Sequence, residues 1–184
     1  MPHKSQKSFD LLKILNIIFI VISVAVCSIL MLFTIPGMEL LDTSPNWLLI
    51  WLVAWSLGRS ADRGAIAGLT IGWIYDGIIG STPSHALPFI VAGVITSRLQ
   101  KQKYIGEDFI SVALIVFFMT VLTEAIFAWL YLRTYFLSIE RVWSKYQQVA
   151  IVSAIITSLW SPIFYYPFNL WQKRFRQMQK KYTN

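Results

Sequence analysis

The chain has 184 residues, of which 56% are hydrophobic and 14% are charged, and its mean hydropathy is +0.58. Soluble domains are about 45–50% apolar, and the excess here lies in long blocks, which excludes a soluble globular fold and predicts a one-domain integral membrane protein. The net charge of +7 comes from basic residues between those blocks, so it requires no nucleic acid, and the single cysteine, Cys27, excludes an internal disulfide.

Six apolar segments follow one another along the chain, and we expect them to be six transmembrane helices in one compact all-α bundle. They cover residues 11–33, 47–57, 64–80, 86–99, 109–132 and 149–171. The first is too long for the core of a signal peptide, so we expect it to be retained. The second to the fourth are shorter than the roughly 20 residues of a typical span. A four-helix alternative, in which the second and fourth are re-entrant, stays open.

The basic residues favour six crossings with both termini in the cytoplasm. In this arrangement thirteen of the sixteen Lys and Arg residues lie on the cytoplasmic side, and those left outside are Arg133, Arg141 and Lys145. Residues 1–10 are then a cytoplasmic N-terminal segment, residues 11–171 the transmembrane domain, and residues 172–184 a cytoplasmic tail. The basic residues of the tail predict contact with anionic membrane lipids.

The second segment carries Trp47, Trp51 and Trp55 at every fourth position. Tryptophans that mark a membrane interface gather at one depth, whereas this stripe runs along the helix. It fits a packed core, a ligand cavity or the face of a partner helix. We favour core filling, because tryptophan contributes a large apolar area.

The third segment has one stripe of small residues and an acid, formed by Gly64, Gly68, Gly72, Asp76 and Gly80 at every fourth position. In lipid, helices associate through close van der Waals contact, which small residues permit. Each glycine inside a helix costs about 1 kcal/mol relative to alanine, so we expect another backbone to lie against the stripe. A helix of the same chain is favoured over a partner's helix, and both stay open.

Two carboxylates lie inside the predicted spans, Asp76 in the third and Glu124 in the fifth. An acid at the bilayer centre costs about 2.5–3.5 kcal/mol, so both are candidate functional groups, and Asp76 should face protein because it shares the glycine stripe. Their predicted depths are similar. Three interpretations stay open: the two acids share a proton, they pair with Arg133, Arg141, Lys145 or a group on a partner, or they hydrogen-bond to a neighbouring helix.

The sequence contains no pattern typical of catalysis. Ser81 or Ser84, His85 and Asp76 supply the residue types of a hydrolase triad, but their spacing does not indicate its geometry. We expect His85 to be a loop residue or a contact at the start of a helix. No cluster has metal-ligand spacing and no phosphate-binding loop follows a strand. We therefore expect no enzymatic activity, no cofactor and no metal site.

The block PNWLLIWLVAWSLGRSADRGAIAGLTIGWIYDGIIGSTPSHALPFIVAGVITSRL, residues 45–99, resembles the MreD family of rod-shape-determining proteins. A proline opens a short apolar helix, a basic turn follows, a glycine-spaced helix ends in an Asp-Gly pair, and a small loop with proline leads into the next apolar helix. The positions that carry this pattern are Pro45, Arg59, Arg63, Gly72, Asp76, Gly77, Gly80, Pro83, Ala86, Leu87 and Gly93.

The resemblance implies a non-catalytic, multi-pass component of the bacterial inner membrane that acts in rod-shape determination and peptidoglycan synthesis. It implies four partners: an MreC-like protein, the actin-like MreB, a RodA-type polymerase and a class B penicillin-binding protein. The motif positions it implies are Gly72, Asp76 and Gly80. The rod-shape function would rest on helix packing with those partners.

An alternative of another class is the vitamin-binding membrane subunit of an energy-coupling-factor transporter, to which the six-helix layout is also similar. Those subunits hold a vitamin in the outer half of the bundle, where Asp76, Glu124 and the tryptophan stripe would serve. Against this alternative, the first helix lacks the A-x-x-x-A docking motif of that class. Ser23-x-x-x-Cys27 is the nearest substitute.

Overall fold

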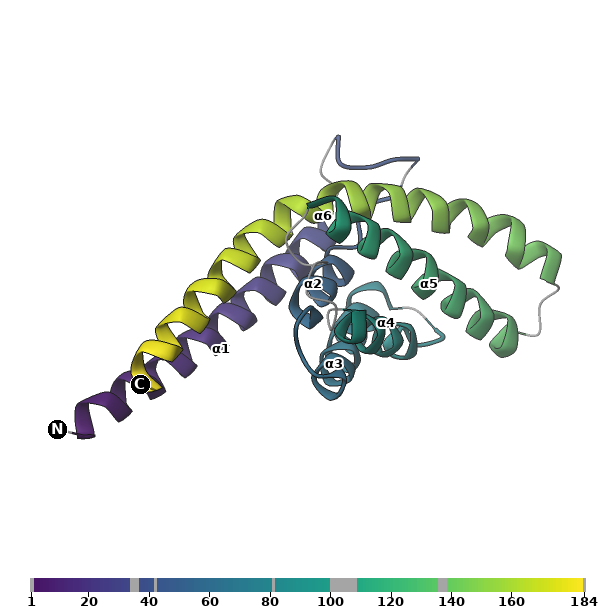
Figure 1. The fold of residues 1–184 in the computed structure, drawn as a ribbon. Helices are drawn as coiled ribbons and strands as arrows, with labels where there is room; N and C mark the ends of the chain where they lie inside the picture. Colours follow the sequence, from purple (N-terminus) through teal and green to yellow (C-terminus); the bar gives the residue numbers. More distant parts are fainter. Residues whose placement is uncertain are drawn as a thin grey trace.

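The computed structural model describes residues 2–33, 37–41, 43–80, 82–99, 109–135 and 139–183. These residues form six helices, which confirms the expected all-α fold (Figure 1). The helices are α1 (Pro2–Leu32), α2 (Trp47–Ser56), α3 (Ala61–Ile79), α4 (Ala86–Leu99), α5 (Phe109–Tyr135) and α6 (Ile139–Thr183). Together they make one compact bundle.

Three stretches of the described helices are long and apolar enough to cross a membrane, Leu11–Leu32, Ile110–Tyr135 and Tyr146–Phe175, which indicates a multi-pass membrane protein. The apolar helices α2 and α4 are shorter, with 10 and 14 residues. A helix rises about 1.5 Å per residue, so α2 is about 15 Å long, half the thickness of a hydrocarbon core of about 30 Å.

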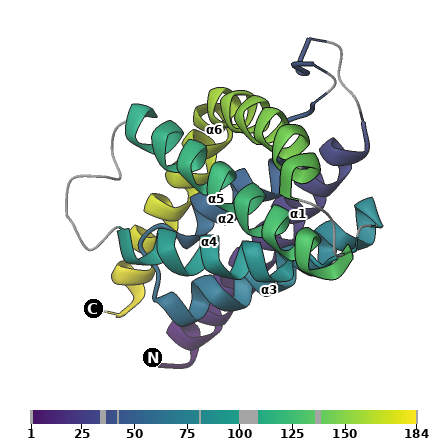
Figure 2. The ribbon, with the colours of Figure 1, turned by 90° about the vertical axis from the view of Figure 1, so that its right-hand side faces the viewer.

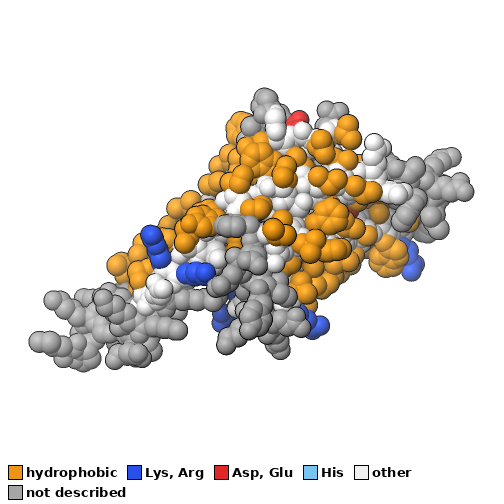
Figure 3. Space-filling view, turned by 45° about the horizontal axis from the view of Figure 1, so that its top comes forward, with side chains coloured by type: hydrophobic (Ala, Val, Ile, Leu, Met, Phe, Trp, Pro, Cys, Tyr) orange, Lys and Arg blue, Asp and Glu red, His pale blue; other side chains and the backbone are white. Residues whose placement is uncertain are grey.

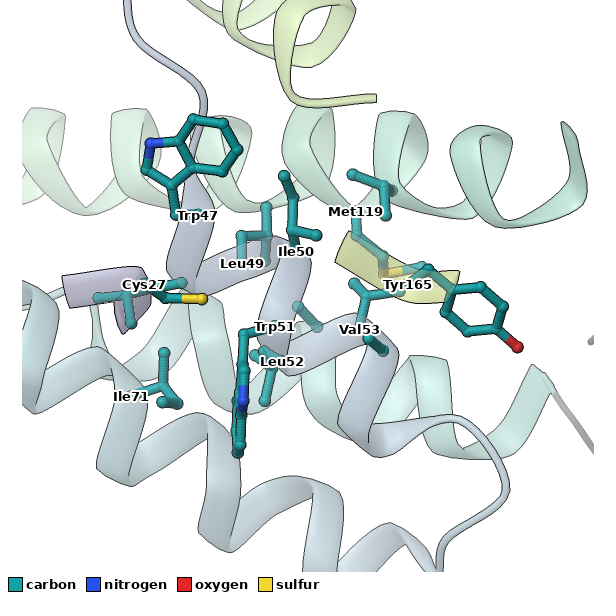
Figure 4. Packing of buried hydrophobic residues seen from close by; sticks show 14 of the residues in the cluster. Cys27, Trp47, Leu49, Ile50, Trp51, Leu52, Val53, Ile71, Met119 and Tyr165 are labelled. Carbon is teal, nitrogen blue, oxygen red and sulfur yellow. The ribbon is translucent and has the colours of Figure 1, made fainter. Parts of the chain in front are cut away.

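α2 forms the centre of the bundle. Nine of its ten residues are buried, and it contacts each of the other five helices. Its sequence is apolar around the whole circumference, as expected for a helix enclosed by protein. Asn46 caps its first turn, because the Asn46 side chain accepts the N–H of Leu49 at 3.0 Å. Figure 4 shows the side chains of α2 filling the space between the surrounding helices.

Trp47 and Trp51 are buried in the core between α2, α1 and α6 and Trp55 packs against it, which supports core filling, although Trp51 also lines an apolar pocket. Trp47, which is 2% exposed, packs against Phe164 of α6 with ring centroids 4.9 Å apart. Trp51 stacks on Trp55 at 5.9 Å and donates its Nε1–H to Ser23 Oγ of α1 at 2.8 Å.

The largest difference from the expected segments lies in α6, which has 45 residues instead of the 23 of segment 149–171. The expected outer loop before it and the expected tail after it are helical over most of their length, because polar sequence ends a membrane span without ending a helix. Pro162 and Pro167 lie inside the helix, which continues through them and bends between its green and yellow halves (Figure 1). Each proline removes one backbone hydrogen bond, and packing against neighbouring helices holds the two arms.

Two antiparallel helix pairs flank the centre, α3 with α4 and α5 with α6, and α1 runs beside the C-terminal half of α6 (Figures 1 and 2). Both described chain ends therefore lie at the same end of the molecule. On the face shown in Figure 3 the described hydrophobic side chains cover the middle, while Lys and Arg lie at its borders.

Candidate functional site at the α3–α4 hairpin

The glycine stripe of α3 lies directly against the backbone of α4. A Cβ atom added at Gly68 would lie 2.7 Å from Ile90 Cα, and one at Gly72 would lie 2.5 Å from Ala86 Cα. A Cβ atom at Gly64 would meet Gly93, which is itself in the same close contact. Of the two interpretations left open by the sequence, the structure therefore shows a helix of the same chain against the stripe.

The other glycines near the end of α3 have different surroundings. Gly77 and Gly80 have no atom within 4 Å of an added Cβ. Gly80 ends α3 in the left-handed conformation, with φ of 65°, and its N–H donates to Asp76 O at 2.8 Å. Glycine adopts this conformation without the steric penalty of a Cβ. Gly80 is therefore a C-cap and does not extend the packing stripe.

The Asp76 carboxylate ties the end of α3 to the start of α4. It accepts the hydroxyl of Ser84 at Oδ2, 2.6 Å, and the backbone N–H of His85 at Oδ1, 2.8 Å. His85 Nδ1 also lies 2.8 Å from Oδ1. A negative charge at the first turn of a helix interacts favourably with its dipole, so Asp76 stabilises the N-terminus of α4. Of the roles considered for Asp76, the structure shows hydrogen bonds within the hairpin.

The hairpin brings together an acid, a serine and a histidine, the residue types of a hydrolase triad, but their hydrogen bonds differ from those of a triad. In a triad the histidine bonds to the serine, and the acid bonds to the far side of the histidine. Here the Ser84 hydroxyl donates to the Asp76 carboxylate. Ser81, the other serine considered, lies outside the described residues. The arrangement is that of a helix-start contact, the role expected for His85.

His85 also joins the hairpin to α5. Its ring stacks on Phe127 with centroids 3.9 Å apart and planes at 12°, and Tyr75 lies 4.5 Å away on α3. Burial lowers the pKa of His85 from its usual 6.5, while the hydrogen bond and the charge of Asp76 oppose that effect. The imidazole is therefore held mainly neutral within a contact between three helices.

We expect His85 to titrate below pH 6.5 in the folded protein. The unfolded imidazole then takes up its proton first as the pH falls, so the fold loses stability from about pH 6.5 downward until the folded ring is protonated. His3 is the only other histidine, so an NMR titration of the His3→Gln variant follows His85 alone. A titration midpoint at or above 6.5 would contradict this expectation.

Glu124, the second candidate carboxylate, lies on α5 close to two tyrosines. It is within electrostatic range of Tyr75 and Tyr146. In the described part of the chain, Glu124 has no hydrogen-bond or ion-pair partner, and it forms no hydrogen bond with Asp76.

The basic residues considered as partners for the two acids do not pair with them where the structure describes them. Arg133 lies over the ring of Trp129, 5.5 Å from its centroid. The side chains of Arg141 and Lys145 lie outside the described residues.

Sequence reasoning grouped Asp76 with Ser84 and His85 only as the residue types of a triad. It missed the hydrogen bonds that Ser84 and His85 donate to Asp76, because partners for an acid inside a span were sought on other helices. The signal was local, since a polar Ser-His pair eight and nine residues after Asp76 precedes an apolar helix. Hydroxyl and backbone donors at a helix start commonly bond to acids. Among the described residues no group of three or more His, Cys, Asp or Glu side chains has the arrangement of a metal site.

Comparisons of the chain with protein-family models, with curated proteins and with solved structures found no match.

Proposed function

We propose that this chain is a non-catalytic plasma-membrane component of the bacterial cell-elongation machinery and acts through helix contacts with partner membrane proteins. The observation that carries the proposal is that residues 45–99, which resemble the MreD family, form the consecutive helices α2, α3 and α4, which contact one another. The motif residues Gly72 and Asp76 lie in the contact that joins α3 to α4. A function that depends on a rigid α3–α4 hairpin accounts for the resemblance of this segment and for the role of its two motif residues.

All six helices cross the membrane in this proposal, with both termini in the cytoplasm. The shared end of the two described termini and the basic residues near it support this topology. The shortness of α2 does not oppose it, because a helix enclosed by protein has its backbone and side chains shielded from lipid. The helices around α2 carry the contact with the bilayer.

The partners implied by the resemblance, an MreC-like protein, MreB, a RodA-type polymerase and a class B penicillin-binding protein, would use surfaces other than the glycine stripe. The stripe is covered by α4. α1 offers a larger exposed apolar surface, since only about 6% of its apolar stretch within Leu11–Leu32 is buried against the rest of the chain. We therefore place the partner contacts outside the α3–α4 interface.

Depletion of this protein in a rod-shaped bacterium that carries it should convert the rods into round cells. Lateral wall growth fails when its membrane machinery is incomplete, while septal growth continues. The length-to-width ratio of cells is measured by microscopy, with a plasmid-borne wild-type copy as the control. Unchanged rods after complete depletion would contradict the proposal.

Glu124 favours a second candidate function, the vitamin-binding subunit of an energy-coupling-factor transporter. This carboxylate lacks a hydrogen-bond partner in the described chain and lies near Tyr75 and Tyr146, an arrangement in which a polar ligand would satisfy it. The two functions are distinguished by extracting small molecules from the purified protein and identifying them by mass spectrometry. Near-stoichiometric retention of one vitamin would favour the transporter.

A further inference from the structure

A basic pocket of about 500 Å³ lies at the end of the molecule that carries the termini. Its lining includes Lys13 of α1, Arg59 of the turn after α2, Arg63 of α3 and Gln172 of α6, and the described lining residues include no acid. The Arg59 guanidinium is held in place, since its Nε–H donates to Trp55 O at 2.9 Å and it lies 4.0 Å over the Trp55 ring. Three cations from three elements thus converge on one cavity.

An apolar pocket of about 260 Å³ lies between the same helices. Its walls are side chains such as Phe19 and Val26 of α1, Ala54 of α2, and Phe168 of α6. Two lining residues with polar side-chain atoms, Ser23 and Trp51, are bonded to each other, because Trp51 Nε1–H donates to Ser23 Oγ at 2.8 Å. Hydrocarbon suits this pocket better than water does.

The two pockets lie one after the other along α1 and α6, and we call the two together the crevice. On α1 the basic pocket takes residues 13–17 and the apolar pocket residues 19–27, and on α6 they take 172–175 and 164–168. At about 1.5 Å per residue, the centres lie about 12 Å apart along both helices. The basic pocket is nearer the chain ends on both, so polarity falls from the membrane surface toward its interior.

Two buried N–H donors lie on α6 between Phe168, which lines the apolar pocket, and Phe175, which lines the basic pocket. Trp171 Nε1 and Gln172 Nε2 are buried and have no hydrogen-bond partner in the described part of the chain. Trp171 stacks on Phe19, with ring centroids 4.5 Å apart, and Phe19 forms part of the apolar wall. A buried donor without a partner is energetically costly. A ligand with acceptor oxygens near Trp171 and Gln172 would remove that cost.

We propose that the crevice between α1, α2 and α6 binds one anionic phospholipid. The phosphate lies among Lys13, Arg59 and Arg63, the glycerol and ester oxygens lie at the level of Trp171 and Gln172, and an acyl chain fills the apolar pocket. Basic pockets between membrane helices on the cytoplasmic side are suited to such headgroups. The lipid joins α1 to the C-terminal half of α6. This role rests on the proposed topology and does not depend on a part in cell elongation.

Native mass spectrometry of the full-length protein, delipidated in detergent and then titrated with phosphatidylglycerol or phosphatidylcholine, tests the headgroup site. We expect one phosphatidylglycerol to be retained under conditions that remove phosphatidylcholine. The double variant Arg59→Gln with Arg63→Gln should weaken lipid affinity about thirtyfold, because it removes two cations that each stabilise the anionic headgroup. The matched control, Arg98→Gln with Arg133→Gln, removes the same charge from exposed positions outside the pocket and should retain the lipid.

A second pair of variants tests the acyl site. Val26→Trp fills the apolar pocket and should abolish retention, whereas Val21→Trp, at an exposed α1 position outside it, should not. Equal retention of the two lipids, or wild-type retention by the arginine pair or by Val26→Trp, would overturn the proposal. Displacement of phosphatidylglycerol by millimolar inorganic phosphate would also overturn it, because it would show a site for free phosphate.

Discussion

Replacing Gly68 with leucine should prevent α3 and α4 from packing and abolish recovery of folded protein. A Cβ at this position already lies 2.7 Å from Ile90 Cα and from the Phe89 carbonyl carbon, and both are backbone atoms. Backbone moves only if the whole of α4 shifts, which would also open the contacts of Gly64 and Gly72. Overpacking of a tight interface costs about 1–3 kcal/mol for added methylenes, and a leucine at a helix–helix contact exceeds that range.

Gly77→Leu is the matched control, because an added Cβ at Gly77 meets no atom within 4 Å. Gly68→Ala should lie between the two, with a lower melting temperature than wild type, whereas Gly77→Ala should be neutral or slightly stabilising. The measurements are the monodisperse fraction in size-exclusion chromatography and the thermal midpoint. Equal stability of Gly68→Leu and Gly77→Leu would remove the close-packing argument.

Asp76→Ala should destabilise the protein by about 3 kcal/mol. Hydrogen bonds to a charged group contribute about 1.5–3 kcal/mol each, and the low end of that range applies to each of the two bonds because water partly reaches this carboxylate. The substitution leaves the Ser84 hydroxyl and the His85 N–H without their acceptor. It also loosens the stack of His85 on Phe127, which connects the hairpin to α5. The free energy of unfolding is measured by denaturant titration in detergent.

Asp76→Asn should lose less, since one amide oxygen still accepts hydrogen bonds while the charge is removed. Asp62→Ala is the control on the same helix. Asp62 is exposed in the first turn of α3, where a carboxylate contributes only about 0.3–1 kcal/mol through the helix dipole. Equal losses for Asp76→Ala and Asp62→Ala would show that the hairpin bonds contribute nothing specific.

Local sequence predicted the helices best where an end is encoded by adjacent residues. α4 begins and ends where expected, at Ala86 and Leu99, and α2 begins at Trp47, directly after its capping residue Asn46. The prediction failed where hydropathy was taken as a measure of helix length. α6 continues through polar sequence at both ends, because polar residues form helices as readily in water as apolar ones do in lipid.

The periodic glycines were sufficient to predict that a backbone lies against one face of α3, because spacing along a helix sets which side chains share a face. Spacing carries no information on which segment returns to that face. The identity of α4 as that segment, the pairing of Asp76 with Ser84 and His85, and the central place of α2 follow from how the chain turns back on itself. These are contacts between segments, and their geometry exists only once the helices have packed.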